Sequence, residues 1–317
     1  MQEMTSIERV RRVLERKGGD RPPSSVAPWE STLKKWVAEG HLQAGEDVHE
    51  HFDQDIRRKA GDLNGVANLD HQDVVLEETE ETILKLDGNG AKYRRHKLHE
   101  SMPEHVDFTV KDRAGWEEHL RPFLVGLDLR RIPLEEYRKD RAFSAEHQRF
   151  FCCHGFGPFE LMQLAVGHEN LLMGMALDPE WVKDMVSVYV EMTIRHQEEM
   201  FARAGYPDGI YYAEDLGFKG KPFMSPAMYR EILQPGHKRL FDFWHGKGFK
   251  VIIHSCGYVE PLVPGLIEAG MDCLQAMEVK AGMDLTRLFD RFGDRIAFYG
   301  GIDARVLASN DRGQIDK

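Results

Sequence analysis

The sequence contains no long apolar run. No stretch of its 317 residues approaches the roughly 18 consecutive apolar residues that a membrane-spanning helix needs. The first residues, MQEMTSIERVRRVLERKGG, lack the apolar core of a secretory signal peptide. We therefore expect a cytoplasmic protein that has no contact with a membrane.

The sequence also lacks an excess of positive charge. It has 42 Lys and Arg residues against 53 Asp and Glu residues, which gives a formal net charge of −11 at pH 7. Proteins that bind nucleic acids or anionic membranes usually do so through clustered positive charge. This charge balance argues against a broad nucleic-acid-binding or membrane-binding surface.

Cysteine is scarce as well. Cys152, Cys153, Cys256 and Cys273 are too few for a disulfide scaffold in a chain of this length, and cytoplasmic thiols stay reduced. Each cysteine is then a buried hydrophobe, a nucleophile or a metal ligand. Cys152 and Cys153 must face opposite sides of a strand, and Cys273 lies near a strand start, where a core position is expected.

Beyond about residue 145, short apolar runs alternate with longer helical segments. One of the helices is expected from Pro179 to about Arg203. Such alternation indicates a parallel sheet, either doubly wound and open or closed into a barrel. No Gly-x-Gly-x-x-Gly fingerprint follows any expected strand, so a dinucleotide-binding fold loses its main support. We predict a (β/α)₈ TIM barrel with strands over 149–153, 209–212, 250–253, 272–275 and 295–299.

The segment from Val74 to Leu98 has a different character. Two short strands joined by the glycine-rich turn 87–90 predict an antiparallel hairpin, and a helix is expected over 112–120. We interpret this part as an insertion on the rim of the barrel. The chain is then expected to be one domain over 1–317, with a hairpin excursion at about 74–98.

Polar side chains follow each expected strand. In TIM barrels the chemistry lies at the C-terminal ends of the strands, where such residues gather. Loops are polar in general, and this explains scattered carboxylates well but a His-x-Cys pair poorly. We take His154, Glu214 and Asp215 as candidate catalytic residues, Tyr212, Glu278 and Asp303 as candidate substrate-binding residues, and His254 and Cys256 as candidate metal ligands.

The motif IIHSCG at 252–257 places an imidazole and a thiol two residues apart at a strand end. Side chains with this spacing on an extended chain point the same way, so His254 and Cys256 can bind one ion. The pair suits Zn²⁺, and an open fourth position would make the site catalytic. The alternative is a thiol without metal, either a nucleophile or inert.

A third ligand would come from Glu214, Asp215, His154 or Glu278. Glu214 and Asp215 are adjacent and face opposite ways on an extended chain, which suits one for the site and one for the loop. Glu214 is the leading candidate, as a ligand or as a general acid with a raised pKa. An alternative role for Asp215 is to cap the loop before the next helix.

Several segments resemble the uroporphyrinogen decarboxylase superfamily, and in particular its methylcobalamin:coenzyme M methyltransferase-like branch. The resemblance covers most of the chain and implies a (β/α)₈ barrel with a deep cleft, and a homodimer. The segments are ERVRRVLERKGGDRPP, GFGPFELMQLAVGHENLLMGMALDPEWV, the stretch from EDLGFKGKPFMSP through VIIHSCGYVEPLV to AGMDL, and FGDRIAFYGGID.

The resemblance implies one of two chemistries. The decarboxylases act without a cofactor and hold a polyanionic tetrapyrrole with an arginine-rich motif, whereas no arginine lies between Arg21 and Arg57. In the methyltransferases, zinc bound by His-x-Cys and a later cysteine activates a thiol, and His254 and Cys256 match that motif. The later cysteine would lie beyond Lys317, so the third ligand comes from there or this subfamily completes its site differently.

The resemblance therefore implies a zinc-dependent methyltransferase that moves a methyl group between a corrinoid, free or protein-bound as methylcobalamin, and a thiol or a methoxy compound. One alternative is a cofactor-free decarboxylase of a smaller carboxylic acid, which chelators would not inhibit. A second alternative is a non-catalytic corrinoid-binding protein, whose partner binding would survive loss of both His254 and Cys256.

Overall fold

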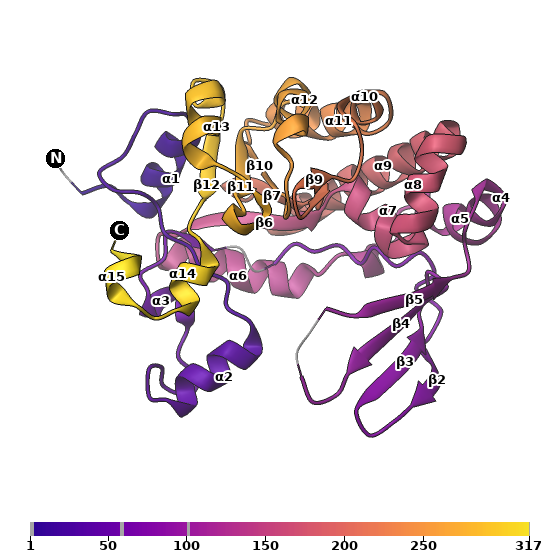
Figure 1. The fold of residues 1–317 in the computed structure, drawn as a ribbon, viewed down its shortest axis with the longest axis horizontal. Helices are drawn as coiled ribbons and strands as arrows, with labels where there is room; N and C mark the ends of the chain where they lie inside the picture. The colour runs from indigo at the N-terminus through magenta and orange to yellow at the C-terminus, as the bar shows by residue number, and fades with distance from the viewer. Residues whose placement is uncertain (1–2, 58–59, 100–101, 317) are drawn as a thin grey trace.

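The centre of the protein is a curled parallel sheet (Figure 1). The computed structural model describes residues 3–57, 60–99 and 102–316. Every ladder of the central sheet is parallel, which confirms the predicted α/β class. Its strand order is β1 (Ile56–Arg57), β6 (Phe150–Phe156), β7 (Gly209–Ala213), β10 (Val251–His254), β11 (Cys273–Ala276) and β12 (Ala297–Gly300).

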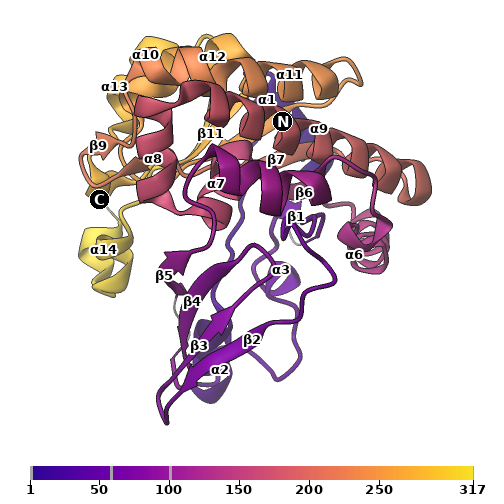
Figure 2. The same cartoon turned by 90° about the vertical axis from the view of Figure 1, so that its right-hand side faces the viewer.

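Helices cover the outer face of this sheet (Figures 1 and 2). The longest, α9 (Pro179–Ala204), starts with Asp178 as N-cap and a proline at its first position, and it ends at Gly205 with a φ of 84°. The predicted long helix is thus confirmed. The others after β6 are α7 (Pro158–Val166), α8 (His168–Leu177), α10 (Pro226–Met228), η3 (Tyr229–Leu233), α11 (Gln234–His245), η4 (Glu260–Leu262), α12 (Val263–Ala269), η5 (Val279–Ala281), α13 (Leu285–Phe292), α14 (Ala304–Ala308) and α15 (Arg312–Ile315).

Before β6 the chain forms further short helices. They are α1 (Ser6–Leu14), α2 (Glu30–Ala38), α3 (Val48–His51), α4 (Arg113–Gly115), the π-helical η1 (Trp116–Leu120), α5 (Arg121–Leu124), η2 (Leu129–Arg131) and α6 (Leu134–Glu146). The helix predicted over 112–120 corresponds to α4 and η1. No helix in the described residues is long and apolar enough to cross a membrane.

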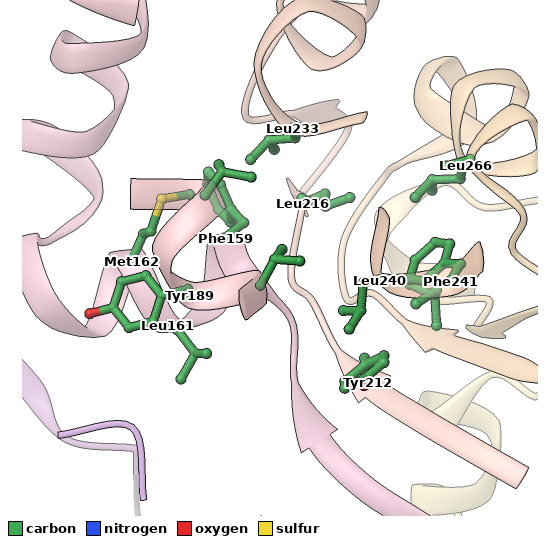
Figure 3. Packing of buried hydrophobic residues seen from close by; sticks show 14 of the residues in the cluster. Phe159, Leu161, Met162, Tyr189, Tyr212, Leu216, Leu233, Leu240, Phe241 and Leu266 are labelled. Atoms are coloured by element: carbon green, nitrogen blue, oxygen red, sulfur yellow. The ribbon is translucent and has the colours of Figure 1, made fainter. Parts of the chain in front are cut away.

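The two faces of the curled sheet bury separate cores. Between sheet and helices lies a large cluster that includes Cys153, Tyr212 and Phe241 (Figure 3). The concave face carries a smaller cluster that includes Cys152 and Cys273, into which α1 inserts apolar side chains. Side chains alternate along a strand, so Cys152 and Cys153 face opposite cores, as the sequence predicts. Cys273 is buried at the start of β11, also as predicted.

The predicted eight-stranded closure is not observed. In the described residues the parallel sheet has six strands, with β1 and β12 as its edges. Between β1 and β6 the chain contributes an antiparallel sheet and helices instead of a further parallel strand. The structure is therefore a curled half-barrel whose strands keep the parallel arrangement that the sequence predicts.

The antiparallel sheet extends away from the body of the protein (Figures 1 and 2). It has four strands rather than the predicted two, namely β2 (Val74–Glu78), β3 (Thr82–Leu86), β4 (Ala91–His96) and β5 (Glu104–Phe108). The predicted turn at 87–90 is confirmed, since Asp87 accepts hydrogen bonds from the backbone of Asn89 and Ala91, and Gly90 has a φ of 71°. Residues 104–108 lack the apolar pattern of a strand, so the sequence does not predict β5.

Candidate functional site

Asp215, His254 and Cys256 meet at the C-terminal edge of the central sheet. His254 ends β10, and its Nε2 lies 3.4 Å from Cys256 Sγ and 3.4 Å from Asp215 Oδ1. The three ligand atoms lie within 4.8 Å of one another, and all three side chains are half-buried. The spacing of His254 and Cys256 predicts this convergence, and of the four candidates for a third ligand the structure places Asp215 beside them.

The loops that carry these residues are tied together by backbone hydrogen bonds. Ala213 pairs with His254 across the β7–β10 ladder, so the segment after β7 runs beside the segment after β10. The N–H of Cys256 donates to Asp215 Oδ1 at 2.7 Å. The next N–H, of Gly257, donates to Glu278 Oε2 at 2.7 Å. Glu278, a predicted substrate-binding residue, therefore anchors this loop.

The donor set fits Zn²⁺. With Zn–N and Zn–O bonds of about 2.0–2.1 Å, a Zn–S bond of about 2.3 Å and tetrahedral angles, ligand atoms lie roughly 3.4–3.6 Å apart. The two distances from His254 Nε2, both 3.4 Å, match this spacing. Imidazole nitrogen, thiolate sulfur and carboxylate oxygen are all ligands that zinc accepts. Three protein ligands leave a fourth position for substrate or water.

The protonation state of the Cys256 thiol depends on whether a cation is bound. Burial, and then the neighbouring carboxylates of Asp215 and Glu278, raise the pKa of Cys256 to about 12. Without a cation the side chain is therefore a protonated thiol at neutral pH and a poor nucleophile. A divalent ion reverses this balance, because a coordinated thiol loses its proton.

Glu214, the leading candidate for third ligand, lies elsewhere. It is fully buried, and its carboxylate accepts hydrogen bonds from the backbone N–H groups of Phe159 and Glu160, both at 3.0 Å. His237 Nε2 lies 2.6 Å from the same carboxylate. Helix α7 has no capping side chain of its own, so Glu214 satisfies its N-terminus. The sequence predicts one carboxylate for the site and one for structure, but the two roles are reversed.

Tyr212, a predicted substrate-binding residue, does not reach the candidate site. Its side chain is fully buried in the layer between sheet and helices, near Leu240 and Phe241 (Figure 3). Its hydroxyl donates to Gln197 Oε1 at 2.5 Å and accepts from Trp244 Nε1 at 2.7 Å. A substrate cannot reach it. The neighbouring Tyr211 faces the concave side instead, because side chains alternate along β7.

The other two candidates do not join the metal-ligand cluster. His154 forms a hydrogen bond with Asp62 through Nδ1, and its ring stacks on Tyr211 with 5.2 Å between centroids. Asp303 caps α14 and forms an ion pair with Arg305 at 2.6 Å. His154 thus lies on the concave side of the sheet, whereas the contacts of Asp303 are local.

A cavity of about 600 Å³ opens beside Asp215. Its walls come from the central sheet with its helices α7 and α8 and from the four-stranded antiparallel sheet, a juxtaposition that local sequence patterns cannot reveal. Phe156, Glu160, His168, Asp215 and Phe223 line it on the side of the central sheet, and Asp73, Asp87, Tyr93, Arg95 and His105 on the side of the antiparallel sheet.

Burial shifts four titratable groups of this cavity toward their neutral forms. It raises the pKa of Glu160 to about 7, with further contributions from Asp215 and Glu214. It also raises the pKa of Asp87, and it lowers the pKa values of His105 and His168. Burial thus favours the neutral forms of these four side chains.

Comparisons with known proteins agree with this architecture. The family model described as uroporphyrinogen decarboxylase (URO-D) matches residues 152–317, which is more than half of the chain. A solved structure described as a methyltransferase from Methanosarcina mazei has a similar fold, with a TM-score of 0.62 and 16% sequence identity over 94% of this chain and 83% of that chain. No curated protein matches the sequence. The chain belongs to the uroporphyrinogen decarboxylase family, as the resemblance of its motifs implies.

Proposed function

We propose that the protein is a zinc-dependent methyltransferase that moves a methyl group between a corrinoid and a thiol or a methoxy compound. The observation that carries this proposal is the convergence of Asp215, His254 and Cys256 beside a cavity large enough for a small substrate. The fold that the chain shares with a methyltransferase from Methanosarcina mazei is consistent with it.

Each member of the cluster has a distinct role in this proposal. Zn²⁺ in a site with three protein ligands would lower the pKa of a substrate thiol or polarise a substrate oxygen at the fourth position. His254 would bind the ion as a neutral imidazole through Nε2. Asp215 and the Cys256 thiolate would contribute two negative charges, which would balance the charge of the ion. A neutral site of this kind tolerates its half-buried position.

The cavity supplies orientation and exclusion of water. Asp215 belongs both to the candidate metal-ligand cluster and to the cavity wall, so a ligand in the cavity would lie beside one of the groups that would hold the ion. Phe156 and Phe223 provide apolar contacts, and the polar groups of the antiparallel sheet provide hydrogen bonds on the opposite wall. Positioning of this kind is a large part of catalysis in transfers between two substrates.

A decarboxylase remains the second candidate, and Glu160 is the observation that favours it. A carboxyl group with a pKa of about 7 in a cavity can protonate the carbanion that loss of CO₂ leaves behind. Asp73, Asp87 and Asp215 line the same cavity against one arginine, Arg95. This balance disfavours a substrate with several carboxylates, so a decarboxylase here would act on a smaller acid.

The first test is the metal content of protein purified without a histidine tag. We expect about one zinc ion per chain in the wild type and none in His254→Ala or Cys256→Ser, because each loses a ligand. Asp215→Asn should bind zinc more weakly. His154→Ala and Asp303→Asn are matched controls, since both change the same residue types at other strand ends and should retain the metal.

Measurements of turnover then distinguish the methyltransferase, the decarboxylase and the non-catalytic corrinoid-binding protein. Transfer of the methyl group of methylcobalamin to a thiol changes the visible absorption of the corrinoid, and it should require zinc and both His254 and Cys256. A folded wild type that binds no zinc when zinc is supplied would refute the methyltransferase. Chelator-resistant release of CO₂ would support the decarboxylase. Corrinoid binding without turnover, unaffected by loss of both residues, would support a binding protein.

A further inference from the structure

We propose that Gln275, oriented by Tyr211, is a positioning residue that keeps the proton of His254 on Nδ1 and directs the Nε2 lone pair at the metal. The inference rests on the proposed metal site and deepens it. Sequence reasoning missed both residues, because neither forms a motif with His254. They meet it only through the register of the parallel sheet.

Gln275 lies beside His254 because β10 and β11 pair in parallel at these two residues. Its amide oxygen Oε1 forms a hydrogen bond with His254 Nδ1. An amide oxygen can only accept, so Nδ1 must be the protonated nitrogen of the ring. A neutral imidazole carries one proton, and Nε2 therefore presents its lone pair. This is the atom that lies 3.4 Å from both Cys256 Sγ and Asp215 Oδ1.

Tyr211 fixes the orientation of the amide. Its hydroxyl donates to the same Gln275 oxygen at 2.7 Å, so this one oxygen accepts from both the phenol and the imidazole. The Tyr211 side chain is 2% exposed and belongs to the core cluster on the concave face of the sheet. Its ring also stacks on His254, with 6.2 Å between centroids and 26° between planes. Packing thus fixes the hydroxyl, the amide and the imidazole together.

The choice of an amide also suits the charge of the site. Zn²⁺ with Asp215 and the Cys256 thiolate is neutral overall, so a further buried carboxylate would add an uncompensated charge. An amide oxygen orients the imidazole without that charge. Groups of this kind, which contact a ligand rather than the metal, typically contribute 10- to 100-fold to metal affinity.

Two measurements test the proposal, and one of them needs no metal. Nitrogen-15 NMR of the histidine rings reports which nitrogen of His254 is protonated in the metal-free protein. Competition with a chromophoric chelator gives the zinc affinity. In Gln275→Leu we expect the Nδ1–H form to lose its preference and the zinc Kd to rise roughly 10- to 100-fold. Tyr211→Phe should shift both quantities in the same direction by less.

Tyr212→Phe is the matched control. It removes a buried hydroxyl from the next residue of the same strand, but on the side that faces the helices. It should leave both the tautomer and the zinc affinity unchanged. Gln275→Glu keeps an acceptor at the same place and should retain the proton on Nδ1 in the metal-free protein. If Gln275→Leu fails to fold, loss of the Nδ1–H form in a folded Gln275→Glu would overturn the proposal.

The outcomes distinguish this inference from the proposed function. A folded Gln275→Leu with the wild-type tautomer and wild-type zinc affinity would overturn the positioning role alone. If the His254 tautomer changes between the wild type and Gln275→Leu but the wild type binds no zinc, the positioning role would be supported and the metal site refuted. An Nε2–H tautomer in the wild type would overturn the inference whatever the metal content.

Discussion

The adjacent residues Glu214 and Asp215 should give opposite phenotypes when each loses its charge. Glu214→Gln replaces an acceptor that serves two backbone N–H groups and His237 with an amide that offers only one oxygen. At least one buried donor then loses its partner and faces an NH₂ group. Each such loss costs about 1–3 kcal/mol, and hydrogen bonds to charged groups lie at the upper end of that range.

We expect Glu214→Gln to reduce the free energy of unfolding by about 3 kcal/mol, which is a large fraction of the roughly 5–15 kcal/mol typical of a folded domain. Asp215→Asn should cost less than about 1 kcal/mol, because the Asp215 side chain is 40% exposed and its amide oxygen can still accept from the N–H of Cys256. Zinc binding should show the reverse order, with a loss in Asp215→Asn and retention in folded Glu214→Gln.

Urea denaturation followed by circular dichroism gives the stabilities, and chelator competition gives the zinc affinities. The m-value must remain unchanged for the comparison of midpoints to hold. The assignment of roles would be refuted by a Glu214→Gln protein as stable as the wild type but unable to bind zinc. It would also be refuted by an Asp215→Asn protein that is strongly destabilised and still binds zinc normally.

Three further predictions concern acid stability, thiol reactivity and the loop that carries the ligands. Burial opposes ionisation of Asp55, but hydrogen bonds from neighbouring arginines and serines outweigh it and lower its pKa. The contribution of the Asp55 carboxylate to stability is therefore present above about pH 4 and is lost as the pH falls through the lowered pKa. Asp55→Asn should reduce the free energy of unfolding in urea by about 3 kcal/mol near pH 7 and by much less near pH 2. An equal reduction at both pH values would contradict this. Since the pKa of Cys256 is raised to about 12, iodoacetamide should alkylate this thiol slowly at pH 7 in metal-free protein. The alkylation rate should rise throughout the alkaline range. Rapid alkylation at neutral pH would instead indicate an activated nucleophile. Gly257 has a φ of 79°, and Gly257→Ala would place a Cβ 2.3 Å from a backbone carbonyl carbon. This substitution should disrupt zinc binding and should lower stability more than Gly248→Ala, because Gly248 has a φ of 85° but open space around it. Equal effects of the two substitutions on melting temperature and zinc content would show that close packing at Gly257 is unimportant.

Local chemistry determined much of this protein in advance. The alternation of apolar runs with helical segments predicts a parallel sheet, and the period of two along β6 places Cys152 and Cys153 on opposite faces. Pro179 and the residues after it predict α9 almost to its last residue. The two-residue spacing of His254 and Cys256 predicts their convergence. All of these features depend on neighbours in the chain, and a sequence reports such neighbours directly.

The tertiary structure decided what the sequence left open. Because Glu214 and Asp215 are adjacent, their side chains point in opposite directions. Only the position of α7 determines which of the two carboxylates caps the N-terminus of that helix. The register of β10 with β11 places Gln275 against His254, and the antiparallel sheet forms one wall of the cavity. These contacts join segments that are far apart in the chain, and their free energy depends on packing and desolvation in the folded state. The sequence alone thus determined the class of fold and two candidate ligands, whereas packing selected the third candidate ligand and the residues proposed to orient the site.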